Sequence, residues 1–491
     1  MARIDLVDVS MRDGNQSLWG ATGLSTAQIL EIAGQVDRVG FKAIDFMASS
    51  HMGTAVRNQR NNPWERIRRA RAAMPRTPLQ FITTGLRFIS WEEADPEFMR
   101  VVFRCLQRNG IRRIKLVESM HDVDAALRAA RMFKEEGGGQ VMAALTYTIS
   151  DVHDDAFYAA YAAKVKASPN VDLFCIKDPG GLLSPERART LVPAIRAVIG
   201  DMPLELHSHS NVGYSQLSGL AAADSGISAI HVGIGPLGDG SSLPEAGRMI
   251  ANLREAGHTV DIDDAVLARV DQYWRRLAKA EGLPAGAPAS FDASFLRHQI
   301  AGGVMSTTRR QLQEINLEHK LPEVIAETER VRRELGQPIM VTPFPQVVIS
   351  QALFNVIGRK RYEQVSDQVI RYVLGKFGRP PNPVDPKVRD AVLDRPRARE
   401  IEREPSFPSY ADLRKRIGVD MNDEEFLLRA VMQGDYVDAM LKHGASVGTY
   451  NPDAAPFKKL LRELAARPAA RDIMVEGKGF RLALHAGGAI D

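Results

Sequence analysis

The sequence is poor in several features that would define its class at once. Only two cysteines, Cys105 and Cys175, occur among 491 residues. They cannot build a disulfide framework or a cysteine-rich zinc site, and they suit a reducing cytoplasm. No apolar stretch reaches the roughly 18 to 20 residues of a membrane helix, and the first residues lack the apolar segment of a signal peptide. We therefore expect a cytoplasmic protein without a membrane span.

A strong excess of one charge is also missing. The chain has 64 basic and 60 acidic residues, a net charge of +4, which does not favour a nucleic-acid partner. Hydrophobic residues make up 44% and charged residues 25% of the chain, a globular rather than a disordered composition. The length exceeds that of one ordinary domain and predicts two.

The first half of the chain repeats short apolar runs, each followed by a segment with helical periodicity. Helix starts are marked by Ser25 and by Ser184 before Pro185, residue types that favour the first positions of a helix. Eight such units predict an α/β fold, a closed (β/α)8 TIM barrel, with an open doubly wound sheet as the alternative. The expected strands are residues 4–9, 43–47, 79–83, 113–117, 141–147, 173–177, 204–207 and 229–233.

The rhythm changes after about Gly257. Helical periodicity is seen over residues 260–281, 312–335 and 346–357, and a stretch rich in Gly and Pro breaks it at residues 378–383. The last hundred residues are expected to mix helix with irregular structure. We therefore expect a barrel domain over residues 1–290, a mainly helical domain over residues 291–475 and a tail over residues 476–491.

Polar side chains stand where three of the expected strands end. Asp13 follows the first run, Lys177 ends the sixth, and His207 and His209 close the seventh. A barrel brings these carboxyl ends to one face, and histidines two apart on a strand share a side. One carboxylate and two imidazoles suit Zn²⁺, Mn²⁺ or Co²⁺. Alternatively, these groups satisfy loop backbone atoms.

Lys177 has several possible uses. A charged, unpaired lysine at the inner end of a barrel strand is costly. Schiff-base chemistry is one use, and reaction with CO₂ is another, because the resulting carbamate is an anionic ligand for a metal. The structural alternative is an ion pair with Asp13 or Asp178.

Taken together, the motifs resemble the biotin-dependent carboxyltransferase family. That family includes the carboxyltransferase domain of pyruvate carboxylase, the α subunit of oxaloacetate decarboxylase and the metal-containing subunit of transcarboxylase. The resemblance covers about residues 1 to 390, and its second part implies a helical domain similar to the conserved carboxylase region. The motifs are residues 12–18, 62–68, 175–183, 207–209, 301–306, 341–346 and 372–387.

The resemblance implies roles for individual residues. Asp13, His207, His209 and a carboxylated Lys177 would hold the metal ion. Arg12 and Gln16 would bind a 2-oxo acid, and the Ser306 hydroxyl would pass a proton between substrate and biotin. Carboxybiotin would release CO₂, and the enolate of pyruvate, stabilised by the metal and Arg12, would attack it.

Several positions depart from the family pattern. Thr84 stands where the family has the arginine that clamps the substrate carboxylate, and Arg87, three residues later, is a candidate replacement. A displaced guanidinium would not keep the same bidentate geometry. Asn15 replaces a usual His, Ser210 a usual Asp, and Val304 a usual Gln or Met. The acceptor is therefore expected to be a small 2-oxo acid or a related ketone.

The sequence contains neither an Ala-Met-Lys-Met biotinylation site nor a Gly-rich phosphate loop. We expect biotin to be supplied by a separate biotin carboxyl carrier protein, with biotin carboxylase as a further subunit. The resemblance also implies a homodimer.

Two other functions remain open. Metal-dependent aldol lyases and Claisen-condensing enzymes, such as isopropylmalate synthase and hydroxymethylglutaryl-CoA lyase, share the Arg-Asp-Gly-x-Gln start and the His-x-His pair. Lys177 and residues 300–390 argue against them. The second alternative is a weakly active scaffold subunit of a carboxylase complex, which only Thr84 supports.

Overall fold

Eight parallel strands close into a barrel in the computed structural model. It describes residues 1–90, 92–300, 302–445, 449–454, 457, 460, 461, 463, 472–477 and 480–485, in part without side chains, as at residues 302–304, 306 and 307. The strands are β1 (Asp5–Asp8), β2 (Ala43–Ala48), β3 (Leu79–Thr83), β4 (Ile111–Val117), β5 (Gln140–Thr146), β6 (Leu173–Asp178), β7 (Leu204–Ser208) and β8 (Ala229–Val232). The prediction of a closed barrel is confirmed for all eight strands, and the doubly wound alternative is wrong because β1 pairs with β8.

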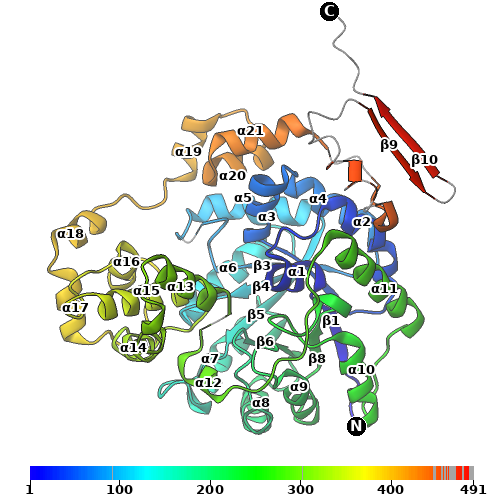
Figure 1. The fold of residues 1–491 in the computed structure, drawn as a ribbon. Helices are drawn as coiled ribbons and strands as arrows, with labels where there is room; N and C mark the ends of the chain where they lie inside the picture. Colours follow the sequence, from blue (N-terminus) through cyan, green and yellow to red (C-terminus); the bar gives the residue numbers. More distant parts are fainter. Residues whose placement is uncertain are drawn as a thin grey trace, which may run out of the picture.

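Helices surround the barrel in sequence order (Figure 1). Two expected helix starts are confirmed: Ser25 caps α2 through a capping box, and Ser184 caps α8, with Pro185 as its first residue. The elements of this region are η1 (Ser10–Gly14), α1 (Asn15–Trp19), α2 (Thr26–Val36), α3 (Ser49–Gln59), α4 (Pro63–Ala73), α5 (Pro96–Arg108), α6 (Val123–Glu135), α7 (Asp155–Lys166), α8 (Pro185–Ile199), α9 (Ser215–Asp224), η2 (Gly235–Leu237), α10 (Ala246–Glu255) and α11 (Asp264–Glu281).

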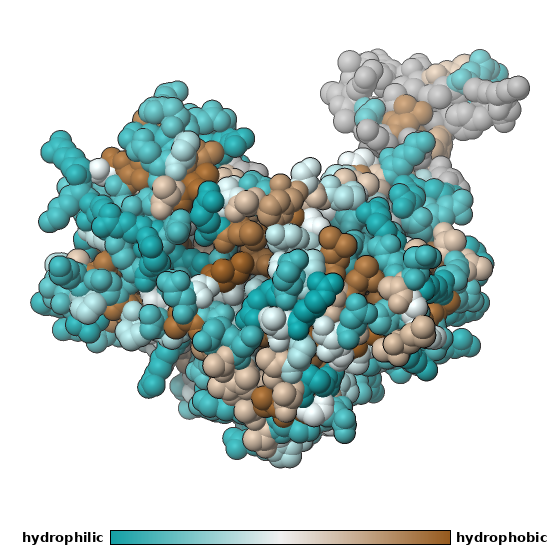
Figure 2. All heavy atoms as spheres, turned by 90° about the horizontal axis from the view of Figure 1, so that it is seen from below, coloured by the Kyte–Doolittle hydropathy of each residue, from teal (hydrophilic) through white to brown (hydrophobic). Residues whose placement is uncertain are grey.

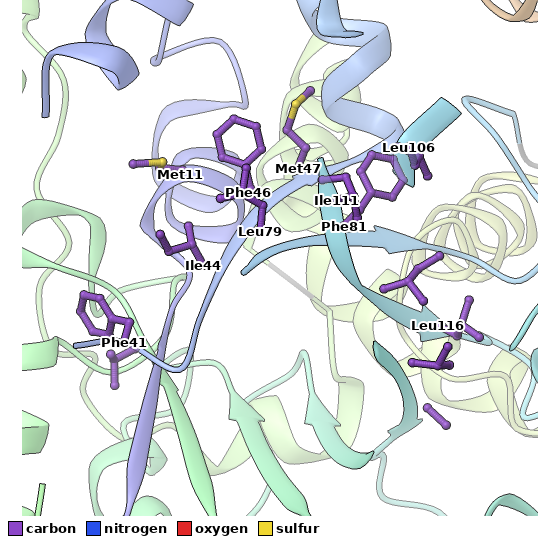
Figure 3. Packing of buried hydrophobic residues seen from close by; sticks show 14 of the residues in the cluster. Met11, Phe41, Ile44, Phe46, Met47, Leu79, Phe81, Leu106, Ile111 and Leu116 are labelled. Carbon is purple, nitrogen blue, oxygen red and sulfur yellow. The ribbon is translucent and has the colours of Figure 1, made fainter. Parts of the chain in front are cut away.

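Strand residues alternate between two environments. Every second residue packs outward against the helices, as Phe46, Phe81 and Ile111 do in the large core cluster (Figure 3). The residues between them point into the barrel, where a small apolar cluster includes Ile82, Met142 and Cys175. Since side chains fill the interior, the barrel is a packed core and its chemistry is confined to one end.

The helical region after the barrel forms a core of its own. This second cluster contains buried residues of α14 to α18 and one barrel residue, Met120. Hydrogen bonds also join the two parts: Arg332 Nη2 donates to Thr148 Oγ1 at 2.8 Å. The helices are α12 (Ala293–His298), α13 (Gly302–Glu314), η3 (Glu318–Lys320), α14 (Leu321–Glu334), α15 (Phe344–Ile357), α16 (Asp367–Val373), α17 (Pro386–Leu393) and α18 (Pro396–Glu402).

One expectation for this region is wrong. The periodicity predicts a single helix over residues 312–335, but α13 ends at Glu314 and α14 begins at Leu321. Asn316 between them has a left-handed φ of 58°, a conformation that asparagine tolerates but that ends a helix. Pro322 then lies in the first turn of α14, where its missing N–H costs nothing.

The next three helices return to the barrel (Figure 1). They are α19 (Tyr410–Ile417), α20 (Asp423–Val431) and α21 (Gly434–His443). Their buried residues, Phe426 among them, belong to the barrel's core cluster. Phe98 of α5 packs against Phe407 and Phe426, with ring centroids 5.2 and 6.2 Å apart, and Trp64 Nε1 donates to Glu424 O.

The described chain ends in elements that the sequence did not predict. After η4 (Pro452–Ala454), β9 (Asp472–Gly477) and β10 (Phe480–His485) pair antiparallel. This small sheet lies across the expected boundary at residue 476. In the described residues no helix is long and apolar enough to cross a membrane, and the face shown in Figure 2 is mostly hydrophilic.

Candidate active site

Four of the expected ligands meet at the carboxyl end of the barrel. Asp13 lies in η1 after β1, Lys177 and His207 are the penultimate residues of β6 and β7, and His209 directly follows β7. Nε2 of His207 is 3.0 Å from Asp13 Oδ2, and Nε2 of His209 is 3.5 Å from the same oxygen. Ligand atoms of Asp13, His207 and His209 all lie within 4.8 Å of one another. Lys177 Nζ lies 3.0 Å from His207 Nε2.

The hydrogen bonding at this cluster fits a cation. Nδ1 of His209 is 2.7 Å from Ser241 O; because a carbonyl only accepts, Nδ1 carries the proton and Nε2 of a neutral ring has a lone pair facing Asp13. Asp13 Oδ2 is buried without a hydrogen-bond partner among the described residues, although Arg12 Nη2 is 2.5 Å away as an ion-pair partner. A divalent ion would satisfy these facing lone pairs.

The protonation states also suit metal ligands. Burial would raise the pKa of Asp13, but the charge of Arg12 and the interactions with His209 and His207 together hold that pKa well below its usual range. Burial, followed by the charges of Lys115 and Lys177, lowers the pKa of His207 well below its usual value. Burial is also the main cause that lowers the pKa of Lys177 to about 7. The cluster therefore combines a carboxylate, neutral imidazole and a partly neutral amine at neutral pH.

Arg12 is held firmly beside the cluster. Its Nε and Nη2 atoms donate to Asp45 Oδ2 of β2 at 3.1 and 2.7 Å. Nε2 of His51 lies 3.0 Å from the Arg12 backbone oxygen. Because the Arg12 side chain is 7% exposed, its position is set by these contacts rather than by solvent. A fixed cation thus stands next to the candidate ligands.

The expected substrate residues are placed less uniformly. Gln16 lies on α1, three residues after Asp13, and is exposed. Thr84 directly follows β3 and is half-buried. Ser306 lies in α13, but its side chain is outside the described part of the chain. The structure therefore brings the metal candidates together, whereas among the described substrate candidates only Arg87 and Thr84 are in contact.

Arg87 is engaged by groups of the protein. Its Nη1 lies 3.8 Å from Glu118 Oε1 and donates to Thr84 O at 3.4 Å. Its Nη2 donates to Phe377 O of the helical region at 3.3 Å. The guanidinium thus contacts the backbone at position 84, where the family has its carboxylate-binding arginine. It also joins the barrel to the helical region.

The loop after β6 is tied down next to His209. The Asp178 carboxylate accepts from the backbone N–H of Leu182 and Leu183 at 2.9 Å, and from Ser208 Oγ at 2.7 Å. It is therefore not the partner of Lys177. Gly181 has φ +69°, and a Cβ atom there would lie 2.4 Å from His209 O, so only glycine lets the loop approach this strand end.

A cavity of about 370 Å³ opens beside the cluster. Tyr147, His153, Arg187 and Tyr214 are among its lining residues, and none of the four ligand candidates lines it. The backbone nitrogen of Tyr147 donates to Lys177 O at 2.7 Å. The cavity is thus a neighbour of the ligand cluster on the same barrel end and not the cluster itself.

Three buried residues lie around the site, and two of them, Asp45 and Glu205, were not singled out from the sequence. Asp45 holds Arg12, while Glu205 and His231 lie behind His207. Burial would raise the pKa of Glu205, but the charge of Arg113, the contact with His231 and the charge of Lys42 together lower it to about 2. The alternation of side chains along β7 could have indicated Glu205, because Glu205 and His207 are two residues apart and share one side of the strand. A charged residue inside the barrel needs a partner there.

Fold and site together define a (β/α)8-barrel enzyme with its polar residues at the carboxyl ends of the strands. An HMGL-like family model matches residues 3–273, and a conserved carboxylase domain model matches residues 295–475. The chain is 30% identical to a pyruvate carboxylase subunit of Methanothermobacter thermautotrophicus, over 88% of this chain and 76% of that one. The chain belongs to the biotin-dependent carboxyltransferase family.

Two further proteins are similar to this chain. The large subunit of 2-oxoglutarate carboxylase from Hydrogenobacter thermophilus is 28% identical, over 87% of this chain and 67% of that one. The carboxyl transferase domain from Rhizobium etli pyruvate carboxylase, solved with pyruvate, superposes with a TM-score of 0.81 at 21% identity, covering 98% of this chain and 83% of that one. This last likeness concerns the fold.

Proposed function

We propose that this protein is a carboxyltransferase that moves a carboxyl group between biotin, carried by a separate protein, and a small 2-oxo acid such as pyruvate or oxaloacetate. The observation that carries the proposal is the meeting of Asp13, His207, His209 and Lys177 at one barrel end. It occurs in a chain whose second region matches the conserved carboxylase domain.

Asp13, His207, His209 and a carboxylated Lys177 would hold one divalent ion, Zn²⁺, Mn²⁺ or Co²⁺. The orphan Asp13 Oδ2 supports this ligand set. When bound, such an ion supplies a Lewis acid that stabilises negative charge on a substrate oxygen. Two imidazoles and oxygen ligands are of suitable softness for these metals.

Carboxylation of Lys177 requires its neutral amine. The neutral nitrogen forms a bond to the carbon of CO₂ and one proton leaves, so that a neutral amine becomes an anionic oxygen ligand. The lowered pKa of about 7 supports this step, because a substantial fraction of the amine is unprotonated at neutral pH.

The chain's own residues bind and orient the acceptor. Arg12, fixed by Asp45, places a positive charge where the enolate oxygen develops charge, and Gln16 would reach the same carbonyl oxygen. Ser306 would pass a proton from the substrate methyl to the ureido nitrogen of biotin. Arg87, near the backbone of Thr84, is the available cation for the acceptor's carboxylate.

The acceptor is a 2-oxo acid or a related ketone. Thr84 in place of an arginine supports an acceptor bound differently from pyruvate. The names of the two relatives include pyruvate carboxylase and 2-oxoglutarate carboxylase, so acceptors with one and with two carboxylates are both to be tested.

The wider organisation is proposed on the same basis. The Methanothermobacter relative is named as one subunit of pyruvate carboxylase, which supports a biotin carboxyl carrier protein and a biotin carboxylase chain as partners. A homodimer and a cytoplasmic location stay predictions. We keep a barrel domain over residues 1–290 and a helical domain over residues 291–475, which the match of residues 295–475 to the conserved carboxylase domain supports. The separate apolar cluster covers residues 300–401 of it, whereas α19 to α21 pack on the barrel.

A turnover assay tests the proposal. Purified protein is incubated with oxaloacetate and free biotin, and pyruvate release is followed. Lys177→Ala is the test variant, and Lys166→Ala, which changes an exposed lysine of α7, is the matched control. We expect release that depends on biotin in the wild type and control, and none in Lys177→Ala.

The alternatives give different results. A metal-dependent aldol lyase or Claisen-condensing enzyme would act on acyl-CoA substrates and ignore biotin; the match of residues 295–475 to the conserved carboxylase domain argues against it. A scaffold subunit would bind carrier protein without turnover. The proposal would be rejected if a folded, metal-loaded wild type released pyruvate from oxaloacetate without biotin or not at all, and transferred no carboxyl group from carboxybiotin to pyruvate or 2-oxoglutarate.

A further inference from the structure

A chain of buried polar side chains lies behind His207, away from the ligand cluster. It contains Arg113 of β4, Glu205 of β7 and His231 of β8, all at most 1% exposed. His231 Nε2 is 3.0 Å from Glu205 Oε2, and His231 Nδ1 is 3.0 Å from His207 Nδ1. The contacts therefore run without interruption from Glu205 to the ring of a candidate metal ligand.

The first link has a fixed direction. Glu205 Oε2 accepts from Arg113 Nη2, and Lys42 Nζ lies 3.9 Å from Glu205 Oε1. Two cations beside a carboxylate favour its charged form, which only accepts hydrogen bonds. His231 Nε2 must therefore carry a proton and donate it to Glu205.

The second link follows from the first. Arg113 and the buried ammonium group of Lys115, which has no hydrogen-bond partner among the described residues, disfavour a further positive charge on His231. A neutral His231 with its proton on Nε2 has a lone pair on Nδ1. That lone pair faces His207 Nδ1, so His207 Nδ1 must donate, and His207 Nε2 is left unprotonated toward Asp13 and Lys177.

We propose that Glu205 and His231 are positioning residues that hold His207 in the Nδ1–H tautomer and so present its Nε2 lone pair to the metal ion. This inference rests on the proposed function, because it assumes the metal site formed by Asp13, His207, His209 and Lys177. Partners of this kind orient metal-ligating histidines in many proteins, and their loss weakens metal binding roughly 10- to 100-fold.

A competing arrangement uses the same residues as ligands. Asp45, His207 and His231 also place ligand atoms within 4.8 Å of one another. However, with the proton of His231 on Nε2, the contact of 3.0 Å between the two Nδ1 atoms is a hydrogen bond from His207 to His231. Arg113 and Lys115 would also repel a cation there. The two histidines are thus a ligand and its support rather than two ligands.

The tautomer is measured first, in metal-free wild-type protein labelled with ¹⁵N-histidine. His207→Gln identifies the resonances of His207 by their loss. We expect the ¹⁵N shifts of His207 to show a protonated Nδ1 and a bare Nε2 at neutral pH. A protonated Nε2 in the folded metal-free protein would overturn the proposal, whatever the variants below do.

Two variants at position 231 then separate the hydrogen bond from packing. His231→Asn can place its Oδ1 where Nδ1 was and still accept from His207, whereas His231→Leu fills space but accepts nothing. Affinity for Zn²⁺ or Co²⁺ is measured by competition with a chelator. We expect a 10- to 100-fold weaker affinity for the leucine variant and a change of only a few-fold for the asparagine variant.

Each result bears on the proposal. Equal affinities of folded His231→Leu and wild type, or losses of equal size in both variants, would overturn it. If His231→Leu does not fold, the ¹⁵N shifts and the affinity of His231→Asn decide. A wild type that binds no divalent ion would reject the metal site itself, whereas normal binding by His231→Leu would reject only the role of His231.

Discussion

Nζ of Lys177 lies 3.0 Å from Nε2 of His207, although the two residues come from neighbouring strands and are 30 positions apart in the sequence. The register explains this contact, because Lys177 of β6 is the direct Cα partner of His207 of β7. Both side chains therefore point into the barrel at the same level. A lysine placed there has the ligand cluster as its neighbour and not Asp178, whose carboxylate is used by its own loop.

Replacing Lys177 by Ala should remove activity and leave the barrel folded, because the side chain reaches the ligand cluster and supports no strand pairing. We expect metal affinity to fall by more than the roughly 100-fold that follows the loss of a group supporting a ligand. Intact-mass spectrometry of the wild type should show one added CO₂ that the variant lacks. Near-normal turnover by a folded Lys177→Ala would exclude the carbamate.

Introducing Arg at position 84 should raise activity with pyruvate. A bidentate guanidinium–carboxylate contact is worth about 1.5 to 3 kcal/mol, so KM for pyruvate should fall roughly tenfold or more. Thr84→Lys is the matched control, since it adds the charge without the planar fork. If both variants leave KM unchanged, Thr84 does not set the specificity.

Acid should destabilise the protein partly through His121. Burial lowers its pKa from 6.5 to about 4 in the folded state, so below pH 6.5 the unfolded chain binds a proton that the folded chain does not. The contribution of the neutral His121 to stability is therefore fully present above pH 6.5, and it is lost as the pH falls toward 4. Between pH 7.5 and 5 this one group should cost about 2 kcal/mol.

His121→Phe tests this effect, because phenylalanine suits the aromatic neighbours Phe157 and Tyr161. The free energy of unfolding in urea should fall by about 2 kcal/mol less in this variant than in the wild type between the two pH values. His443→Phe, an exposed position of α21, should behave like the wild type. Equal pH dependence of all three proteins would contradict the role of His121.

The return of α19 to α21 to the barrel should contribute strongly to stability. Phe426 is fully buried, packs on Phe98 and lies 3.9 Å below the Arg414 guanidinium. Phe426→Ala should cost about 3 to 5 kcal/mol, measured by urea unfolding. Val419→Ala, at a position that is 70% exposed, should change stability by no more than about 0.5 kcal/mol. Similar values for both variants would show that these helices are not docked as described.

The barrel and the meeting of the four candidate ligands could be predicted because they depend on local patterns. Short apolar runs define strands, and the fold then brings every strand end to one face. Asp13, Lys177, His207 and His209 needed no knowledge of contacts beyond that rule. The helix break near Asn316 was missed because apolar periodicity continues across it, although Asn316 and Pro322 together are a signal for a break.

The supporting contacts could not be predicted in the same way. The pairing of Arg12 with Asp45, or of Glu205 with His231, depends on the stagger between strands, which the sequence does not give directly. The packing of α20 on α5 could not be predicted from the sequence either, because an amphipathic pattern shows that a helix has a buried face but not which surface covers it. Family resemblance supplied roles for Gln16 and Ser306 that side-chain geometry alone does not assign.

The chain connects the helical region to the barrel at both of its ends, in addition to the hydrogen bonds of Arg332 and Arg87 between the two parts. It leaves the barrel near residue 300 and comes back to it at Phe407. A deletion that removes everything after residue 404 would therefore strip the covering from α4 and α5 while leaving the cluster of α14 to α18 whole. A fusion that replaces the helical region by another module should therefore be joined at both connections, near residue 300 and before Phe407, so that α19 to α21 stay on the barrel.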